Sequence, residues 1–338
     1  MNKKHLHICH SLSFGGITTF VKALANLNTN SNANHHILVW QKEAKGENVI
    51  DISNDNDQPK KFRQLVDGYD LLFVHSLKLS FLPTLLKHKS RVFLFQHGMT
   101  FGSGIRRIYK QCVYFFVINV LGFKVVCSSN FAKQKLKAQI GVLRDTSVKI
   151  IPFGIDGEHQ SEITPSQETL HLGFAGRLVA QKRIHLLLES LSQIKCKSLV
   201  VLKVAGTGQL LNTLKKTVQQ INNKNVEVNF LGELNSMSDF YANIDVFVLP
   251  SIGESYGLVV LEALFHNVPV IVFEDTGACV DFVVHGENGY VVKNEAELSE
   301  TLCELQSVEL RQKLKRNIQQ MDYSKYHISS TKSILDEL

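Results

Sequence analysis

The sequence has no uninterrupted apolar run of about 20 residues, the length that a membrane-spanning helix requires. Its six cysteines are scattered and include no C-x-x-C pair, so we expect free, reduced thiols. It contains no G-x-G-x-x-G fingerprint, which weighs against a nicotinamide-dependent dehydrogenase. It also lacks the interleaved aromatic and basic residues of nucleic-acid-binding segments, so we expect no nucleic-acid partner. What remains is a globular protein, and 44% hydrophobic residues are enough for a sizeable core.

The amino-terminal segment, MNKKHLHICHSLSFGG, has two lysines but no long apolar stretch, so we expect no signal peptide and a cytoplasmic protein. The same segment carries the densest group of potential metal ligands: His5, His7, Cys9 and His10. They lie on one predicted strand whose successive side chains point to opposite faces. We therefore expect no metal site there.

Charge is unevenly distributed along the 338 residues, a length that favours two domains. Residues 1–155 hold 21 Lys and Arg against 8 Asp and Glu, a net of +13; the remainder holds 16 against 23, a net of −7, and the two sum to the formal +6. A basic first half suits an anionic membrane surface or an anionic acceptor. The alternative is a solvated, lysine-rich surface. We expect peripheral contact with the inner face of the cytoplasmic membrane.

Short apolar runs alternate with amphipathic segments along the whole chain, the pattern of two successive doubly wound α/β domains. We expect the first domain over 1–152, an irregular linker over 153–170 and the second domain over 171–323. The predicted strands are His5–His10, Ile37–Trp40, Asp70–His75, Arg91–His97, Lys124–Ser128, Val148–Pro152, His171–Ala175, Leu199–Ala205, Val226–Leu231, Asp245–Pro250, Pro269–Phe273 and Gly289–Val292. The predicted helices are Gly16–Leu27, Leu79–Lys87, Ile105–Leu121, Asn130–Ile140, Arg183–Ile194, Gln209–Asn222, Met237–Asn243, Gly257–Phe265, Glu295–Gln306 and Glu309–Met321.

Two segments of the first half have a less regular pattern. The polar stretch Lys42–Lys61, rich in Asn and Asp, is expected to be loop or poorly ordered. In residues 105–127, Arg106, Arg107 and Lys110 precede a strongly apolar sequence. The segment is either an interfacial membrane element or a buried helix and strand, and we favour the buried alternative.

Two glutamates eight positions apart, Glu254 and Glu262, are the most informative residues of the chain. Asp245–Pro250 is a predicted strand, and a loop carrying Glu254 leads into a predicted helix that carries Glu262. In a parallel sheet this places Glu254 at the carboxyl end of a strand, where open α/β sheets bind ligands. Carboxylates there are well suited to accept hydrogen bonds from sugar hydroxyls.

This stretch resembles the Glu-x7-Glu signature of retaining glycosyltransferases of the GT-B fold, family 4 (glycosyl transferases group 1). The resemblance implies an α/β protein with two doubly wound Rossmann-like domains facing across a cleft, and a final helix over 324–338 that crosses back to the first domain. It implies that Glu254 contacts the donor sugar and Glu262 the nucleotide ribose. It also places Tyr256, Gly257 and Leu258, between the two glutamates, against the nucleotide sugar.

A second motif, FAGRLVAQKR, puts Arg177 just after a predicted strand and Lys182 at the start of a helix. A guanidinium and an ammonium at such a position form an anion site. The spacing resembles the G-R-x5-K pattern of the family, which implies that Arg177 and Lys182 bind the diphosphate. For the neighbouring Arg183 we expect a surface role.

Four further segments resemble loops of the family but are less specific. Gly15 and Gly16 follow the first strand and open a helix, as in the acceptor and phosphate loop. Gly206 begins a turn that resembles A-G-x-G, and Leu231 lies in a segment that places the nucleotide base; each is alternatively a structural turn. His97 ends a strand where many family members have a histidine that reaches the donor sugar. A buried core histidine is the alternative for His97, and His75 is a weaker candidate.

This chain departs from the pattern of the family at two places. Val280 and Asp281 stand where Pro and Glu are usual in the family, so we infer no role for Asp281. In the linker, Phe153 replaces an Asn. With no D-x-D motif near the donor residues, we expect no metal cofactor. We predict a hexosyltransferase-type enzyme that uses a UDP-sugar and a glycan or lipid-linked glycan acceptor of lipopolysaccharide, O-antigen or capsule. The rivals are a GT-B sugar-nucleotide epimerase or phosphorylase, and a non-catalytic sugar-nucleotide-binding partner of a biosynthetic complex.

Overall fold

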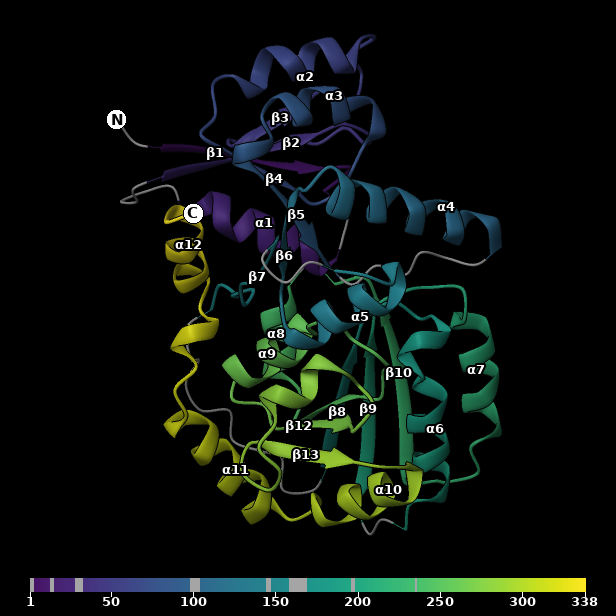
Figure 1. The fold of residues 1–338 in the computed structure, drawn as a ribbon. Helices are drawn as coiled ribbons and strands as arrows, with labels where there is room; N and C mark the ends of the chain where they lie inside the picture. Colours follow the sequence, from purple (N-terminus) through teal and green to yellow (C-terminus); the bar gives the residue numbers. More distant parts are fainter. Residues whose placement is uncertain are drawn as a thin grey trace. The chain divides into compact units, whose positions relative to one another are not determined.

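A computed structural model describes residues 3–12, 15–27, 33–97, 104–143, 147–157, 169–195, 198–234 and 236–338. The chain divides into two compact units, which Figure 1 colours from purple at the amino terminus to yellow at the carboxyl terminus. Unit 1 consists of Met1–Asp156 together with Ser324–Leu338, and unit 2 is Gly157–Tyr323. Residues 158–168, most of the predicted linker, lie outside the described residues.

Unit 1 contains a seven-stranded sheet in the order β3-β2-β1-β4-β5-β6-β7, and all of its pairs are parallel. The chain runs outward from β1 to β3, then crosses to the other side of β1 and continues from β4 to β7. The order therefore reverses between β1 and β4, the kind of position at which open α/β sheets bind ligands. The strands are β1 (Lys3–Cys9), β2 (Ala33–Val39), β3 (Val49–Asp51), β4 (Leu71–Val74), β5 (Val92–Gln96), β6 (Lys124–Cys127) and β7 (Val148–Ile150).

The helices of unit 1 connect these strands, and the last one returns from the end of the chain. Helix α12 joins unit 1 because Thr331 donates its hydroxyl to the Pro152 carbonyl (2.8 Å) and accepts from the Gly154 amide (2.7 Å). The helical elements are α1 (Gly16–Asn26), α2 (Gln58–Val66), η1 (Leu79–Phe81), α3 (Leu82–Lys87), η2 (Lys89–Arg91), α4 (Gly104–Phe115), η3 (Phe116–Val120), α5 (Asn130–Ile140), η7 (Ser324–Tyr326) and α12 (Ile328–Asp336).

Unit 2 contains a six-stranded parallel sheet in the order β10-β9-β8-β11-β12-β13. Here the order reverses between β8 and β11. The strands are β8 (Thr169–Ala175), β9 (Leu199–Ala205), β10 (Val226–Gly232), β11 (Val246–Leu249), β12 (Val270–Phe273) and β13 (Gly289–Val292). The helical elements are η5 (Ala180–Lys182), α6 (Ile184–Gln193), α7 (Leu211–Gln220), α8 (Met237–Ala242), α9 (Leu258–Phe265), η6 (Ala278–Phe282), α10 (Glu295–Glu304) and α11 (Val308–Gln320).

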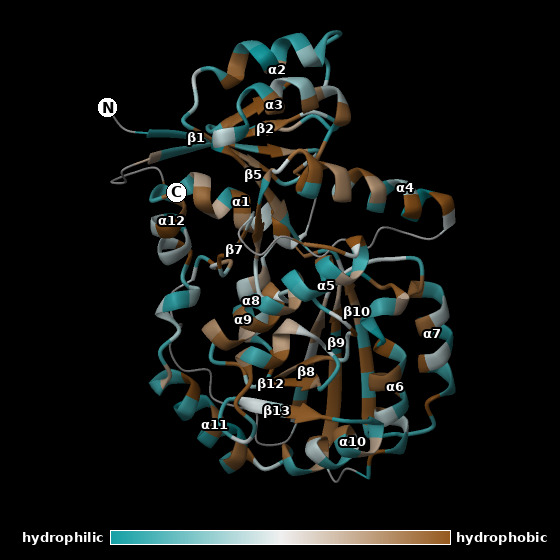
Figure 2. Ribbon diagram, viewed as in Figure 1, coloured by the Kyte–Doolittle hydropathy of each residue, from teal (hydrophilic) through white to brown (hydrophobic). Residues whose placement is uncertain are grey.

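Strands β11 and β12, and β5 apart from Gln96, are apolar on both faces because helices cover both sides of a parallel sheet. All residues of β11 and β12 are buried, as are all of β5. Figure 2 colours the strands predominantly brown, for hydrophobic residues, whereas the outer helices alternate between brown and teal. This alternation is the expected pattern of a helix with one face on the core.

The prediction of a loop over Lys42–Lys61 was correct for residues 42–48 and 52–57, but it missed two regular elements. The segment contains β3, which pairs with β2, and the start of α2. The carboxylate of Asp57 caps α2 by accepting from the Lys60 amide (3.0 Å), and Phe62 and Val66 bury one face of the helix. These are the only two buried residues of α2. They pack the helix against the core, but two residues are too few to produce a recognisable hydrophobic period in the sequence.

The preferred interpretation of residues 105–127 as a buried helix and strand was correct for the strand, β6, where Val125, Val126 and Cys127 are buried, but wrong for α4. Tyr114 is the only buried residue of α4, and the side chains of Ile105 and Ile108 are 86% and 60% exposed. Burial begins in the following turn, η3, with Val117 and Ile118. None of the helices in the described ranges is long and apolar enough to cross a bilayer.

Candidate active site

The reversal between β8 and β11 in unit 2 brings two of the predicted site residues into contact. Lys182 follows β8 and Glu254 follows β11. The Lys182 ammonium donates to Oε1 of Glu254 over 2.7 Å, and each side chain is 15% exposed. A partly buried ion pair at the carboxyl ends of two neighbouring strands is placed to exchange its internal contact for a polar ligand.

The backbone around Glu254 is held on both sides. Its amide donates to the Thr276 carbonyl (2.5 Å), and its carbonyl accepts from the Ala278 amide (2.9 Å). These bonds form a short parallel bridge to Gly277, in the loop that follows β12. The carboxylate therefore projects from a segment fixed by two strand-end loops.

Arg183, for which a surface role was expected, holds the neighbouring segment in place. Its side chain is only 18% exposed. Its guanidinium bonds to both oxygens of Asp275, with Nη1 to Oδ2 at 2.8 Å, and donates to the Pro250 carbonyl (2.7 Å). The loops after β8, β11 and β12 are thereby tied together directly beside Lys182. Sequence reasoning missed this role because Asp275 is 92 residues away and becomes a neighbour only through the strand order.

Glycines permit the strand-end loops to approach one another closely. A Cβ atom on Gly206 would lie 2.0 Å from the Gly176 carbonyl oxygen, which only glycine allows. The Gly206 amide also donates to the Gly232 carbonyl (2.6 Å), so the ends of β8, β9 and β10 are in contact. Arg177, the residue after Gly176, is exposed. Leu231, near the end of β10, has an unusually exposed apolar side chain at 41%.

The start of α9 depends on Gly257. Its φ of 84° lies in the left-handed region, and a Cβ would lie 2.0 Å from Sγ of Cys279. Tyr256 is buried, and its carbonyl accepts from the Cys279 thiol (3.3 Å). Helix α9 then begins at Leu258, so its first backbone amides follow directly on the predicted Tyr256–Leu258 segment.

Glu262 lies on α9 and bonds to a residue that the sequence did not suggest. The Tyr241 hydroxyl donates to Oε2 of Glu262 over 2.9 Å. Burial raises the pKa of Glu262, and the hydrogen bond from Tyr241 opposes that rise. The pKa of Tyr241 is raised well above its usual value by burial and by the Glu262 charge. Glu262 is thus anchored by α8 rather than by Lys182 or Glu254.

The remaining predicted residues belong to unit 1. Gly15 and Gly16 are exposed at the start of α1, and Gly15 needs its glycine for a φ of 145°. Ser13 and Phe14 of the same loop lie outside the described residues. His97 follows β5 and bonds through Nε2 to Nδ1 of His75, with 2.6 Å between the two nitrogens. Burial lowers the pKa of His97 to about 3, so its ring is neutral.

Two further observations concern potential metal ligands and cysteines. Among the described residues, His5, His35 and Asp336 have ligand atoms within 4.8 Å of one another. The Lys332 ammonium bonds to the other oxygen of that carboxylate (2.8 Å) and so opposes a cation there. Cys196 lies outside the described residues. The described cysteines are all free: Cys9, Cys112, Cys127, Cys279 and Cys303.

Comparison with known proteins shows that part of the chain is similar to a family of glycosyltransferases. Residues 157–321 match the family model of glycosyl transferases group 1. The chain is 30% identical over 171 residues to the capsular polysaccharide biosynthesis glycosyltransferase CapM of Staphylococcus aureus, a match that covers 50% of this chain and 45% of CapM. It is 26% identical over 250 residues to the UDP-Gal:alpha-D-GlcNAc-diphosphoundecaprenol alpha-1,3-galactosyltransferase of Escherichia coli. That match covers 68% of this chain and 61% of the galactosyltransferase. The matched segments thus span less than two thirds of either relative.

The fold itself has close counterparts among solved structures. The crystal structure of Anabaena Alr3699/HepE in complex with UDP and glucose superposes with a TM-score of 0.77, covers 99% of both chains and is 17% identical. At that identity the likeness establishes the fold. The predicted GT-B fold class, with two Rossmann-like α/β domains, is confirmed.

Proposed function

We propose that this protein, whose residues 157–321 belong to the glycosyl transferases group 1 family, transfers a hexose from a UDP-sugar to a hydroxyl group of a glycan or lipid-linked glycan. The observation that carries the proposal is the contact between Lys182 and Glu254 at the strand-order reversal of unit 2. It places a cation and an anion side by side where open α/β sheets bind ligands, and a nucleotide sugar offers a partner to each of them.

The donor site follows from the chemistry of each residue. Arg177 and Lys182 bind the diphosphate, and the first amides of α9, after Tyr256, Gly257 and Leu258, add hydrogen-bond donors and a partial positive charge. Glu254 accepts hydrogen bonds from hydroxyls of the transferred sugar.

Two further contacts complete this proposed site. Glu262 accepts from the ribose while Tyr241 holds its other oxygen, a contact supported by the 2.9 Å bond between those two residues. The exposed face of Leu231, beside the turn at Gly206, supplies an apolar surface for the base.

In the proposed reaction the sugar keeps its anomeric configuration. The acceptor hydroxyl attacks from the face that the diphosphate leaves, and the departing phosphate oxygen takes the hydroxyl proton. Two protein cations, Arg177 and Lys182, offset the charge that develops on the diphosphate. Because they supply that positive charge, we propose that no metal cofactor is required. In unit 1, His97 contacts the sugar, and Gly15 and Gly16 bind the acceptor or a phosphate.

The identity of the donor and acceptor classes is supported by the relatives. The galactosyltransferase of E. coli is named for a UDP-sugar donor and a diphosphoundecaprenol-linked acceptor, and CapM for capsular polysaccharide biosynthesis. We extend both features to this chain. The acceptor is then a glycan or lipid-linked glycan of a bacterial surface polysaccharide, such as lipopolysaccharide, O-antigen or capsule.

A lipid-linked acceptor implies work at a membrane, and α4 is suited to it. Its exposed face combines Ile105 and Ile108 with Arg106, Arg107 and Lys110. Apolar and basic side chains together on one exposed helix bind an anionic lipid surface. We propose that unit 1 contacts the cytoplasmic membrane peripherally through α4.

The test is turnover with a panel of UDP-sugars, each with and without lipid-linked acceptors. The proposal requires sugar transfer that depends on the acceptor. Isomerisation of the donor without acceptor would instead identify an epimerase. Donor binding without any turnover would identify a non-catalytic sugar-nucleotide-binding partner.

A further inference from the structure

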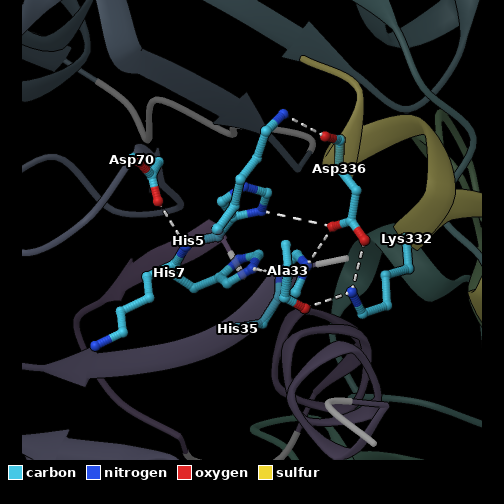
Figure 3. Close-up of polar contacts among 9 residues, drawn as sticks. His5, His7, Ala33, His35, Asp70, Lys332 and Asp336 are labelled. Carbon is cyan, nitrogen blue, oxygen red and sulfur yellow. Dashed lines mark hydrogen bonds and ion pairs between the residues drawn. The ribbon is translucent and has the colours of Figure 1, made fainter. Parts of the chain in front are cut away.

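Four histidines in unit 1 form an unbroken chain of hydrogen bonds that ends on a carboxylate. Nε2 of His35 lies 2.9 Å from Oδ1 of Asp336, and Nδ1 of His35 lies 2.8 Å from Nε2 of His7. Nδ1 of His7 lies 2.8 Å from Nε2 of His75, and Nδ1 of His75 lies 2.6 Å from Nε2 of His97. Figure 3 shows the Asp336 end of this chain, where α12 meets β1 and β2.

The chain crosses the sheet from strand to strand. His35 lies on β2, His7 on β1, His75 directly after β4 and His97 directly after β5, and these four strands are neighbours in the order β2-β1-β4-β5. The rings of His7 and His35 are fully buried and His75 is 6% exposed. Buried rings require hydrogen-bond partners, and here each ring supplies the partner of the next.

Burial and hydrogen bonding set the charges of the four rings and of Asp336. Burial lowers the pKa of every ring in it, that of His7 and His75 to well below the usual value, so all four are neutral. Burial alone would raise the pKa of Asp336, but hydrogen bonds from His35 and Lys332 outweigh it, and the pKa is lowered. The end group is therefore a carboxylate.

These charge states fix the position of every proton. A neutral imidazole has one N–H, and a carboxylate can only accept. His35 must therefore donate through Nε2 to Asp336, which leaves its Nδ1 to accept from Nε2 of His7. By the same argument, His75 donates through Nε2 to Nδ1 of His7, and His97 donates through Nε2 to Nδ1 of His75. Each of the four hydrogen bonds thus uses the single N–H of one histidine. His97 is left with its proton on Nε2 and an acceptor lone pair on Nδ1.

We propose that Asp336 sets the tautomer of His97 through His35, His7 and His75, and thereby makes Nδ1 of His97 an acceptor for a hydroxyl group of the sugar. The inference deepens the proposed function and rests on it for the identity of the ligand. Asp336 and the three intervening histidines are positioning residues, because they act on the substrate only through His97.

Lys332 makes the proposal testable by an isosteric change. Its buried ammonium donates to Oδ2 of Asp336 (2.8 Å) and to the Ala33 carbonyl (2.8 Å). In an Asp336→Asn variant the amide oxygen has to face Lys332, since an ammonium can only donate. The amide nitrogen then donates to Nε2 of His35. Each of the four histidines must then adopt the opposite tautomer, and His97 has its proton on Nδ1.

The experiment is a long-range ¹H–¹⁵N correlation spectrum of the full-length protein with ¹⁵N-labelled histidine, at neutral pH and with EDTA present. The His97 signals are identified by their loss in His97→Gln. We expect the Nε2–H tautomer in the wild type and in the control Glu337→Gln, and the Nδ1–H tautomer in Asp336→Asn. The same tautomer in all three proteins overturns the proposal.

A second variant guards against misfolding of the first. His7→Phe interrupts the chain in its middle while it retains an aromatic ring. Asp336 can then no longer dictate the proton on His97, and we expect a mixture of both tautomers. A single, unchanged Nε2–H tautomer in this variant counts against the proposal.

Activity separates this inference from the proposed function. With an active pair of UDP-sugar and acceptor, Asp336→Asn should lower kcat/KM at least about tenfold, since the sugar hydroxyl then loses the acceptor at Nδ1 to which it donates. A reversed tautomer with unchanged kcat/KM would overturn the role in substrate recognition. If the wild type transfers no sugar at all, the proposed function fails. The tautomer measurement needs no substrate, so it still tests whether Asp336 sets the tautomer of His97.

Discussion

The ammonium of Lys182 lies 2.7 Å from the carboxylate of Glu254, although the two residues are 72 positions apart. In the free protein each group neutralises the other, so neither is left as an isolated, partly buried charge. A nucleotide sugar has to replace this contact with its diphosphate on Lys182 and its hydroxyl groups on Glu254. The pair therefore holds both side chains at the position at which the donor is proposed to bind.

Lys182→Ala and Glu254→Ala should each reduce kcat at least about tenfold, or about 1.4 kcal/mol in activation free energy. Each substitution removes one donor contact and leaves its partner as an unpaired charge. Steady-state kinetics with the active donor is the measurement, and Lys216→Ala, which removes an exposed lysine of α7, is the control. Rates like those of the wild type in both variants would refute the assignment.

Gly257→Ala should lower the free energy of unfolding by about 1–3 kcal/mol from backbone strain alone. The contact with Sγ of Cys279 adds to that loss. Urea unfolding of Gly257→Ala, Cys279→Ala and the double variant forms a cycle, and we expect the second substitution to offset part of the first. Gly232→Ala is the control, since Gly232 has a φ of 71° but open space around its Cβ position. Equal losses at Gly257 and Gly232 would contradict the steric part.

Glu262 should make stability depend on pH in a direction opposite to that of most carboxylates. Burial raises its pKa above the usual 4.5, so the folded state retains a proton that the unfolded state has already lost. The contribution of Glu262 to stability therefore falls as pH rises from about 4.5 through its folded-state pKa. Glu262→Gln should gain stability relative to the wild type between pH 4.5 and neutral pH in urea unfolding. A difference that does not change with pH would be inconsistent with this carboxyl environment.

Ile105→Asp and Ile108→Asp should weaken binding to vesicles that contain phosphatidylglycerol. Burial of one isoleucine contributes about 1.5 kcal/mol, so each change should reduce the affinity about tenfold. Vesicle co-sedimentation measures this, with phosphatidylcholine vesicles as the neutral comparison. Leu79→Asp, an exposed apolar residue of η1, should have no comparable effect. Equal binding by all variants would exclude α4 as the contact.

Local sequence patterns predicted the regular elements well where one rule dominated. Strands Leu199–Ala205 and Gly289–Val292 and helix Asn130–Ile140 have the predicted bounds. An apolar run interrupted only by Lys203 marks the first of these strands. Ser129 caps the helix, because its hydroxyl oxygen accepts from the Ala132 amide (3.0 Å). The helix α2 was missed because two buried residues give it almost no hydrophobic period.

The site was only partly predictable because much of it depends on strand order. The motifs singled out Lys182 and Glu254 separately, but their contact follows from the adjacency of β8 and β11. The chain of hydrogen-bonded histidines could not be predicted from the sequence for the same reason. His7 was weighed only against neighbours on its own strand, whereas its partners His35 and His75 come from β2 and from the end of β4.

The most direct test of the account is a calorimetric titration of UDP-sugars onto the wild type, Lys182→Ala and Lys216→Ala. We predict that at least one UDP-sugar binds the wild type and Lys216→Ala equally, and Lys182→Ala at least about tenfold more weakly. Absence of heat with every UDP-sugar, or equal affinity in all three proteins, would contradict the claim that the loops after β8 and β11 form a nucleotide-sugar site.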